Sequence, residues 1–590
     1  MKHPRFILAT AFVLSTAAMR LHAADFHFNV PTGDWNTAAS WLENAVPGIG
    51  GGNFAFVNNG GTVNITSTIP VIQDPFIGSG GGTSGTVNHS AGVHSNVGWV
   101  FIGEQGGTGA YNLTGPGNTL GSGDLSTGRI YIGGRRGVTA GGTGTMSVNT
   151  TGTVTAGSDL SVGTRGGNGT LTITAGTVNA NTWFIVGETE GGNGGSTGTV
   201  VQNGGNVTGG ATDVNGRFWI ASQEGAAGPV SNGSYTINNG NLTVRNAIIG
   251  KNYTGTFNQN NGIVTINNAA NDSRLGEAAG STGIYNMAGG LLTMGANFQI
   301  GASGTGNFNQ TGGIVNASNF PVVGRFTGGT GTLNISSGSF NQTDAGTAMI
   351  VGEAGTGTIN VSGSGAVTAQ NNLLLGTEAG GTGNVNQTGG TVSVVNTLDL
   401  QNLGTGTYLL DGGTLSVNGT VDDTAGAFIF TGGVLTRSNA GTINYLGNLL
   451  VGQNDATLKL DNNKLFAVSG NLGIVGGVTF DLNGDLLPVY SGSGVDYGSI
   501  PLGTDGSITG TFDPLTTLLL NLGNTAGATY ISEIAGETSA YSVGNESVYW
   551  VQENAGGVTL NWSIVPEPSI FASLLGGLGM LTALQRRRRA

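Results

Sequence analysis

The chain has 590 residues, of which 113 are glycine and none is cysteine, and its formal net charge is −13. Only 9% of the residues are charged and 37% are apolar, which excludes collagen and ordinary disorder. The lack of cysteine excludes a disulfide framework and thiolate metal sites. The acidic balance argues against nucleic acid as a partner. The glycine content instead predicts frequent turns between short apolar strands.

Residues 1–24 have the pattern of a secretory signal peptide. Two basic residues precede an apolar stretch, Phe6 to Ala18, which is too short to span a membrane. Small residues then close the segment, and we expect cleavage after Ala23 or Ala24. The sequence therefore predicts export.

Residues 25–95 open with two tryptophans, Trp35 and Trp41, followed by Pro47-Gly48. Such openings are similar to the starts of many exported bacterial β-repeat proteins. A stack of repeats needs its first coil covered, and large aromatic side chains suit that task. We expect this range to form an N-terminal capping β region.

Residues 96–402 repeat a short apolar strand that closes on glycine, at a spacing of roughly 23 to 34 residues, which is typical of solenoids. A Gly-rich turn, an alternating strand, a Gly-Gly turn and another short strand follow each copy. Three short strands cannot close a core within one unit, whereas stacked units bury the inward side chains. We predict an all-β fold, a parallel β-helix or β-solenoid of about a dozen coils. Clear copies of the glycine-closed strand end at Gly103, Gly133, Gly163, Gly187, Gly250, Gly301, Gly352 and Gly376.

The repeats resemble the autotransporter-associated β-strand repeat class, which implies parallel β-helix architecture. That resemblance rests on the glycine-closed strands and the alternating strands that follow them.

Polar residues recur at equivalent positions of the alternating strand, where stacked amides can hydrogen-bond along a ladder. We assign them to this structural role in preference to ligand binding. The asparagines are Asn112, Asn258, Asn286, Asn309, Asn334, Asn360 and Asn386, and the glutamines are Gln202, Gln259, Gln310 and Gln387.

The turn after the glycine-closed strand carries charges of both signs in successive units. Opposite charges one rung apart give cross-strand pairs worth roughly 0.2–1 kcal/mol each. We therefore expect ion pairs in preference to catalysis at Arg165–Glu188, Lys251–Glu277 and Arg325–Glu353.

Aromatic residues provide the candidate glycan contacts. Trp99 and Trp183 hold equivalent places just before their strands, and Trp219 lies within one. Exposed, they could stack on sugar rings; turned inward, they would fill the corners of the coil, and we favour the second arrangement.

Threonines beside glycine suggest a different surface, a flat row of the kind used by ice-binding solenoids. The irregular length of the repeat units argues against ice binding, because a match to the ice lattice needs a constant repeat. The row comprises Thr170, Thr199, Thr256, Thr332, Thr358 and Thr407.

No group of residues predicts an enzyme, a metal site or a cofactor. His89 and His94 are five residues apart with no acidic partner nearby, which disfavours a metal site. Asp422-Asp423 and the pair Asp481 and Asp485 could be glycosidase carboxylates, yet such proximity is common in an acidic chain. We expect no catalytic residue.

From residue 403 the repeat loosens, and residues 453–563 lose the period while remaining β-like. We expect degenerate repeats followed by a C-terminal β cap or small β-sandwich over 403–563.

The last segment, 564–590, joins the motif Val565-Pro566-Glu567-Pro568 to an apolar run and the basic cluster Arg586 to Arg589. An apolar helix stopped by a cytoplasmic basic cluster is a membrane segment, here of marginal length. The order of features closely resembles the PEP-CTERM sorting signal of Gram-negative bacteria. The resemblance implies recognition by an exosortase at Pro566, Glu567 and Pro568, removal of the tail, and membrane attachment before processing. A permanent anchor stopped by Arg586, Arg587, Arg588 and Arg589 is the alternative.

These features together predict an exported, non-enzymatic, adhesin-like or structural protein of the cell surface, outer membrane or extracellular matrix. One alternative is a β-helix that binds or degrades polysaccharide, with an exopolysaccharide or surface glycan as partner. A further alternative is an ice-binding solenoid.

Overall fold

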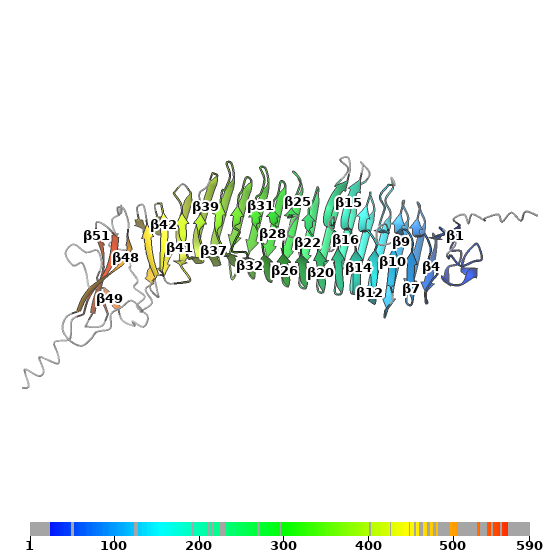
Figure 1. Cartoon of the computed structure of the whole chain (residues 1–590), viewed down its shortest axis with the longest axis horizontal. Helices are drawn as coiled ribbons and strands as arrows, with labels where there is room; N and C mark the ends of the chain where they lie inside the picture. The colour runs from blue at the N-terminus through cyan, green and yellow to red at the C-terminus, as the bar shows by residue number, and fades with distance from the viewer. Residues whose placement is uncertain are drawn as a thin grey trace, which may run out of the picture.

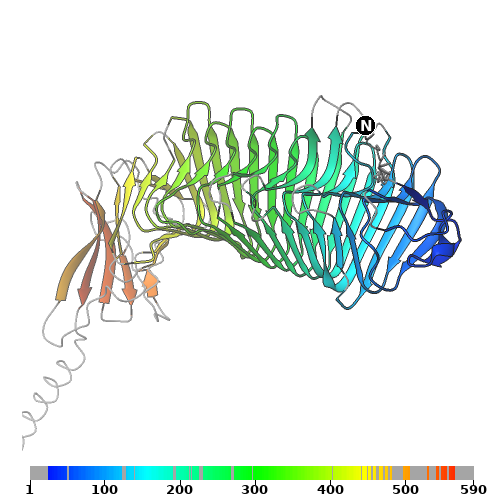
Figure 2. The ribbon, with the colours of Figure 1, turned by 45° about the vertical axis from the view of Figure 1, so that its right-hand side comes forward.

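The computed structural model describes residues 24–452 with short gaps, and beyond them the strands that lie between 456 and 564. The chain forms a rod of stacked coils, with the N-terminal coil at one end and the strands after residue 496 at the other (Figure 1). Two long sheets run along the rod, one of 23 strands (sheet 1) and one of 29 strands (sheet 2). The turned view shows the coils stacked in parallel planes (Figure 2).

Sheet 1 contains one short strand of each coil, including all the glycine-closed strands, and each pairs in parallel with its equivalents in neighbouring coils. In chain order these strands are β1 (Asp25–His27), β3 (Phe54–Val57), β5 (Asp74–Ser79), β8 (Val100–Glu104), β11 (Ile130–Ile132), β13 (Asp159–Thr164), β15 (Trp183–Glu190), β18 (Arg217–Glu224), β21 (Ala247–Ile249), β24 (Ser273–Leu275), β27 (Phe298–Ile300), β30 (Pro321–Val323), β33 (Met349–Val351), β36 (Leu373–Leu375), β38 (Leu398–Asp399), β40 (Thr420–Asp422), β42 (Gly441–Leu446) and β45 (Lys464–Val468).

Sheet 2 contains the other two strands of each coil, which fuse into one long strand in several coils. Its strands are β2 (Thr32–Asp34), β4 (Asn59–Ile65), β6 (Ser84–His89), β7 (Val93–Asn96), β9 (Thr108–Gly115), β10 (Thr119–Ser122), β12 (Thr143–Ala156), β14 (Asn168–Ala180), β16 (Thr197–Gln202), β17 (Asn206–Gly209), β19 (Asn232–Ile237), β20 (Asn241–Val244), β22 (Thr254–Gln259), β23 (Ile263–Ile266), β25 (Thr282–Met287), β26 (Leu291–Met294), β28 (Thr305–Gln310), β29 (Ile314–Ala317), β31 (Thr330–Ile335), β32 (Ser339–Gln342), β34 (Thr356–Val361), β35 (Ala366–Ala369), β37 (Thr382–Val394), β39 (Thr405–Val417), β41 (Ala427–Thr436), β43 (Leu449–Gly452), β44 (Ala456–Lys459), β46 (Leu472–Val475) and β47 (Thr479–Asp481).

The parallel β-solenoid is confirmed, but the predicted number of coils is wrong: the rod has about 16 turns instead of about a dozen. The ladder starts earlier than the repeats suggest, because β1 already pairs with β3 and β3 with β5. It also continues past residue 402 through β40, β42 and β45. The count from the sequence falls short partly because β1, β3 and β40 do not close on glycine, whereas β5 and β42 do, at Gly78 and Gly447.

Glycine is required at the corner where sheet 1 turns into sheet 2. Gly301 follows β27 with a φ of +72°, and a Cβ there would lie 2.1 Å from the carbonyl oxygen of Thr330 in the next coil. Gly331, the inward second residue of β31, approaches equally closely, since its Cβ would lie 2.0 Å from the oxygen of Ile300. Only glycine fits both the left-handed backbone and the contact. The corner therefore explains why most alternating strands have glycine as their second residue, usually after Thr or Asn.

The interior is a continuous stack of buried apolar side chains from Phe28 to Leu458. Aromatic rings lie face to face along part of it, with ring centroids 5.2 Å apart for Tyr235 and Phe257 and 4.8 Å apart for Phe257 and Tyr285. Each ring sits one rung above the last, which is the spacing that a parallel ladder imposes. Burial of these side chains supplies the main stabilising free energy.

Buried glutamines hold consecutive coils together inside the rod. Gln259 donates from Nε2 to the oxygens of Gly262 in its own turn and Leu291 in the next coil, at 3.2 and 3.0 Å. Its Oε1 accepts a hydrogen bond of 2.6 Å from Tyr285 of that next coil. Gln202 and Tyr235 repeat the arrangement. The glutamines therefore point inward and clamp turns, and the predicted glutamine–glutamine ladder is wrong.

The first coils are filled by the two tryptophans of the opening segment. Trp35 is fully buried and Trp41 nearly so, their ring centroids are 5.1 Å apart, and Trp41 Nε1 donates to the oxygen of Trp35 at 2.9 Å. A short 3₁₀ helix, η1 (Ala38–Ser40), connects them. Residues 25–95 thus form the first coils themselves, and the tryptophans fill them from within.

The last described strands change from parallel to antiparallel pairing. β48 (Asp496–Thr504) pairs with β52 (Gly557–Ile564), β52 with β51 (Ser547–Asn554), β51 with β50 (Ala540–Val543) and β50 with β49 (Ala528–Tyr530). β45 joins β48 to the solenoid through a parallel pair. Among the described residues, no helix is long and apolar enough to cross a membrane. The predicted signal segment 1–23 and the tail 565–590 lie outside the described residues.

Candidate functional surface

The outer face of sheet 1 collects aromatic side chains along the rod. The middle residue of each glycine-closed strand points outward, and a ladder of rings runs from His27 through Phe56, Phe76 and Phe101 to Tyr131. The centroids of consecutive rings are 4.7 to 5.8 Å apart. Parallel strands in register place equivalent residues one rung apart, so like rings stack.

Further along the same face, cations and indole rings alternate. Arg136 lies over Trp183 at 4.9 Å from the ring centroid, and Arg217 lies 5.4 Å from the same ring. Arg217 also lies 4.8 Å from the centroid of Trp219, whose ring is contacted by Lys251 at 4.0 Å. These five residues form a cation–aromatic stack along the rod. Burial and the neighbouring Arg217 lower the pKa of Lys251, although Glu277 opposes the shift.

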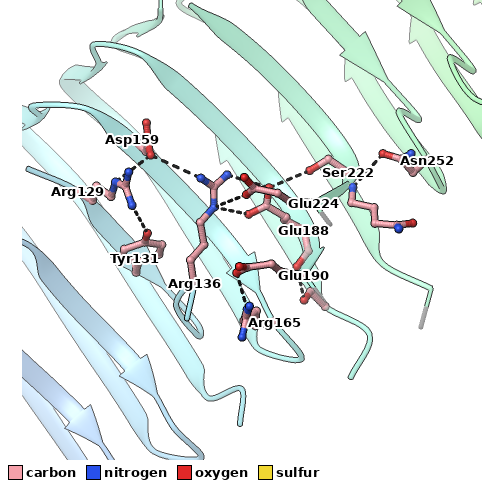
Figure 3. A network of polar contacts seen from close by, with 12 residues as sticks. Arg129, Tyr131, Arg136, Asp159, Arg165, Glu188, Glu190, Ser222, Glu224 and Asn252 are labelled. Atoms are coloured by element: carbon pink, nitrogen blue, oxygen red, sulfur yellow. Dashed lines mark hydrogen bonds and ion pairs between the residues drawn. The ribbon is translucent and has the colours of Figure 1, made fainter. Parts of the chain in front are cut away.

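Carboxylates beside this stack pair with Arg136 and with the neighbouring Arg129 (Figure 3). Glu188 is fully buried and accepts two hydrogen bonds of 2.9 Å from Arg136, whose Nε also lies 3.2 Å from Glu224. Arg129 pairs with Asp159 at 3.0 Å. Burial raises the pKa of Glu188, and the adjacent Arg136 opposes that shift. Paired guanidinium and carboxylate groups compensate the desolvation of each other, which is how a buried charge is tolerated.

Of the three predicted ion pairs, Arg325–Glu353 is confirmed. The partners of the other two differ from the prediction. Arg165 pairs with Glu190, because Glu188 is held by Arg136 from two coils earlier. Glu277 pairs with Arg274 at 3.3 Å, since Lys251 lies over Trp219 instead.

The candidate glycan-contact tryptophans lie on this outer face of sheet 1, neither inside the core nor with free ring faces. Trp99 packs against Phe101 and Tyr131 and is covered by Arg129, at 5.1 Å from its centroid. Trp183 and Trp219 are components of the cation–aromatic stack. A sugar ring would have to displace a guanidinium or ammonium group before stacking on them.

Sequence reasoning missed the arginines that cover these rings. The alignment of successive coils could have located Arg217, because Asp159, Trp183 and Arg217 occupy the same position in three consecutive coils. Unequal loop lengths conceal that equivalence in the sequence.

The asparagine ladder is confirmed on the outer face of sheet 2. Asn286 donates from Nδ2 to Oδ1 of Asn258 at 2.9 Å, and the same bond recurs coil by coil. It links Asn309 to Asn286, Asn334 to Asn309, Asn360 to Asn334 and Asn386 to Asn360, at 2.7 to 2.9 Å.

The histidines that sequence reasoning weighed as metal ligands are fully buried in the interior. His89 contacts the hydroxyl of Tyr111 at 3.0 Å and the oxygen of Gly92 at 3.0 Å, so it replaces glutamine in the turn clamp. His94 contacts the same hydroxyl, and burial lowers its pKa to about 3. In the described part of the chain, no three His, Cys, Asp or Glu side chains gather in a group that could hold a metal ion.

The candidate glycosidase carboxylates do not form a described pair. Asp423 accepts a hydrogen bond from Tyr445, and burial raises its pKa. Asp422 binds the backbone nitrogen and the hydroxyl of Thr424 in its own turn. The side chain of Asp481 and the whole of Asp485 lie outside the described part of the structure.

Comparisons with known proteins found no similar protein. No protein-family model matches the chain, and neither the curated proteins nor the solved structures contain a significant match.

Proposed function

We propose that this chain is an exported, non-enzymatic rod of the cell surface or extracellular matrix, adhesin-like or structural, sorted through its C-terminal tail. The observation that carries the proposal is that the polar side chains of the coils serve coil-to-coil contacts. Buried glutamines clamp turns, asparagines bond along the ladder, and Glu188 is held by Arg136. Such a molecule is suited to maintaining an extended shape.

In this proposal the two ends of the chain carry the export and sorting signals. β1 begins at Asp25, so removal of residues 1–24 leaves every strand intact. The proposed sorting residues Pro566, Glu567 and Pro568 follow β52, which ends at Ile564, so processing there leaves the described strands whole. An exosortase-type enzyme is the proposed partner, and a C-terminal membrane helix stopped by Arg586 to Arg589 holds the chain until processing.

Cell fractionation tests the proposed sorting signal directly. Pro566→Ala/Glu567→Ala/Pro568→Ala is compared with wild type and with Ser569→Ala/Ser573→Ala as a matched control just beyond the motif. We expect the triple variant to remain in the membrane at full mass, while wild type and the control lose the tail and reach the surface or medium. Unchanged location and mass in the triple variant would contradict the sorting proposal.

A second candidate, a polysaccharide-binding or polysaccharide-degrading β-helix, follows from the long outward-facing sheet 2. Degradation would depend on carboxylates such as Asp422 and Asp423. Release of new reducing ends from a polysaccharide panel, abolished in Asp422→Asn/Asp423→Asn, would establish it and contradict the non-enzymatic assignment.

The ice-binding alternative gains one observation. The strands keep a constant register from coil to coil, because irregular unit lengths are absorbed in the loops. The objection about unit length therefore loses its force, but Ile284, Asn307 and Asn384 interrupt the predicted threonine row. Thermal hysteresis of the purified chain tests this alternative.

A further inference from the structure

The outer face of sheet 2 is uncharged over most of the rod. From β9 to β37, no strand of sheet 2 contains Asp, Glu, Lys, Arg or His. The charges of these coils lie in sheet 1 and in the loops that enter and leave it, as Arg136, Glu188 and Arg325 illustrate. We call the outward side of sheet 2 between β9 and β37 the neutral face.

Threonine hydroxyls and methyl groups dominate one column of the neutral face. The first residue of each alternating strand points to solvent, and paired strands place these residues in register. The unbroken run of this column is Thr254, Thr282, Thr305, Thr330, Thr356, Thr382 and Thr405. Two residues further along each strand, a second outward column adds Thr256, Thr332, Thr358 and Thr407.

The asparagine ladder forms the third column and is polarised. Each Asn Nδ2 donates to the Oδ1 of the preceding coil, as from Asn334 to Asn309 and from Asn360 to Asn334. A side-chain amide has two N–H donors and two acceptor lone pairs, so each asparagine within the ladder retains one N–H and one lone pair. These groups point the same way at every rung.

The spacing of the neutral face is fixed by the corner glycines. Gly331 and Gly357 must both lie against the end of sheet 1, where a Cβ would come within 2.0 and 2.1 Å of a carbonyl oxygen. The threonines on either side are therefore held at one rung spacing, ~4.8 Å along the rod, and about 6.6 Å apart along the strand. The result is a regular array of hydroxyl and amide groups.

We propose that the neutral face binds an extended, uncharged polysaccharide lying along the rod. This inference rests on the proposed role in the surface or matrix and names the partner of that rod. A neutral polyhydroxyl chain exchanges hydrogen bonds with threonine and asparagine side chains and brings no charge to be desolvated. An acidic polymer is repelled by a chain of net charge −13.

The affinity for the polysaccharide comes from repeating the same weak contacts along many coils. One hydrogen bond exposed to water contributes only about 0.5–1.5 kcal/mol, so a single coil binds weakly. A polymer held at one coil meets the next coil at a high effective concentration, and successive contacts add up to avidity. This mode of binding requires a long rod and a long polysaccharide, and it does not depend on a deep pocket.

Co-sedimentation of the full chain with microcrystalline cellulose and with chitin tests the proposal. Thr330→Lys/Thr356→Lys places two charges in the first column of the neutral face. The matched control is Thr327→Lys, an equally exposed threonine in the turn that leaves sheet 1. We expect wild type and the control to sediment with at least one polymer, and the double variant to lose about tenfold or more in affinity with an unchanged melting temperature.

Three outcomes would overturn the proposal: no sedimentation with either polymer, equal sedimentation of the double variant, or a wild-type dimer that the double variant dissociates. Thermal hysteresis in wild type that is lost in the double variant would assign the face to ice instead. Failure here leaves the fractionation result untouched, so the two proposals fail separately.

Discussion

The two outer faces of the solenoid follow opposite rules. On sheet 1, Trp183, Arg217 and Glu188 differ from their neighbours one coil away, and each is held by partners of a different kind. On sheet 2, threonine and asparagine repeat with little change over many coils. A face whose side chains neutralise one another needs no regularity, whereas a repeated uncharged face presents the same groups at every rung. The difference fits a stabilising role for sheet 1 and the proposed partner-binding role for sheet 2.

The largest expected effect comes from removing a cation on sheet 1. Arg136→Met leaves Glu188 buried without its charge partner, and loss of one member of a buried pair costs about 3–5 kcal/mol. Urea unfolding followed by tryptophan fluorescence, which reports on nearby Trp183, measures the loss. The control Arg325→Met breaks a more exposed pair and should cost about 1 kcal/mol or less. Equal costs would remove the distinction between a stabilising face and ordinary surface ion pairs.

The corner that couples the two faces is the next test. Gly301→Val combines a strained positive φ with a clash against the next coil, and should lower the free energy of unfolding by about 2–4 kcal/mol. Gly328→Ala is the control, because its φ is +84° but a Cβ there meets no atom within 4 Å. Its expected cost is about 1 kcal/mol. Denaturation midpoints of the two variants that coincide would contradict a contact-based role for the corner.

Inside the rod, two equivalent glutamines allow a finer comparison. Gln259 accepts from Tyr285, whereas Gln310 has Leu333 at the corresponding place in the next coil, and no described residue donates to its Oε1. Gln259→Met therefore leaves one more buried polar group without a hydrogen-bond partner than Gln310→Met does, namely the hydroxyl of Tyr285. We expect it to cost about 1–2 kcal/mol more in urea unfolding. A larger cost at Gln310 would show that the tyrosine bond contributes little.

The smallest effect concerns pH. Burial raises the pKa of Asp74 and Glu104, against the opposing charge of Arg135, so the folded state binds their protons more tightly than the unfolded chain does. The stability that these groups provide is therefore greatest at low pH, and it is lost as pH rises through the unfolded and then the raised folded values. Burial lowers the pKa of His94 to about 3, which costs stability as pH falls below the unfolded histidine value, so the acidic groups are isolated by comparing wild type with a variant. We expect the melting temperature of wild type relative to Glu104→Gln to increase from pH 7.5 to pH 5. A difference that stays constant or decreases over that range would contradict the raised pKa of Glu104.

The sequence predicted the elements that depend on periodicity. Glycine-closed strands, the alternating strands that follow them and the asparagine ladder all repeat, and repetition along the chain becomes stacking in space. The coils built from β1, β3 and β40 escaped prediction, since their strands do not close on glycine. The environments of Trp183 and Glu188 escaped as well, because Arg136 reaches Glu188 across an intervening coil of different length. Inward and outward positions were confused for Gln259, which lies at the end of its strand where the alternation is hardest to follow.

The salt dependence of polysaccharide binding tests the central claim most directly, because the neutral face has no charge and sheet 1 has many. Wild-type affinity for the polymer that it sediments with is measured between 50 and 500 mM NaCl, a range in which the Debye length falls from roughly 14 to roughly 4 Å. Binding through the neutral face predicts an affinity that stays constant within about twofold. An affinity that falls steeply with salt would show that charged groups hold the polymer, and this would contradict the account.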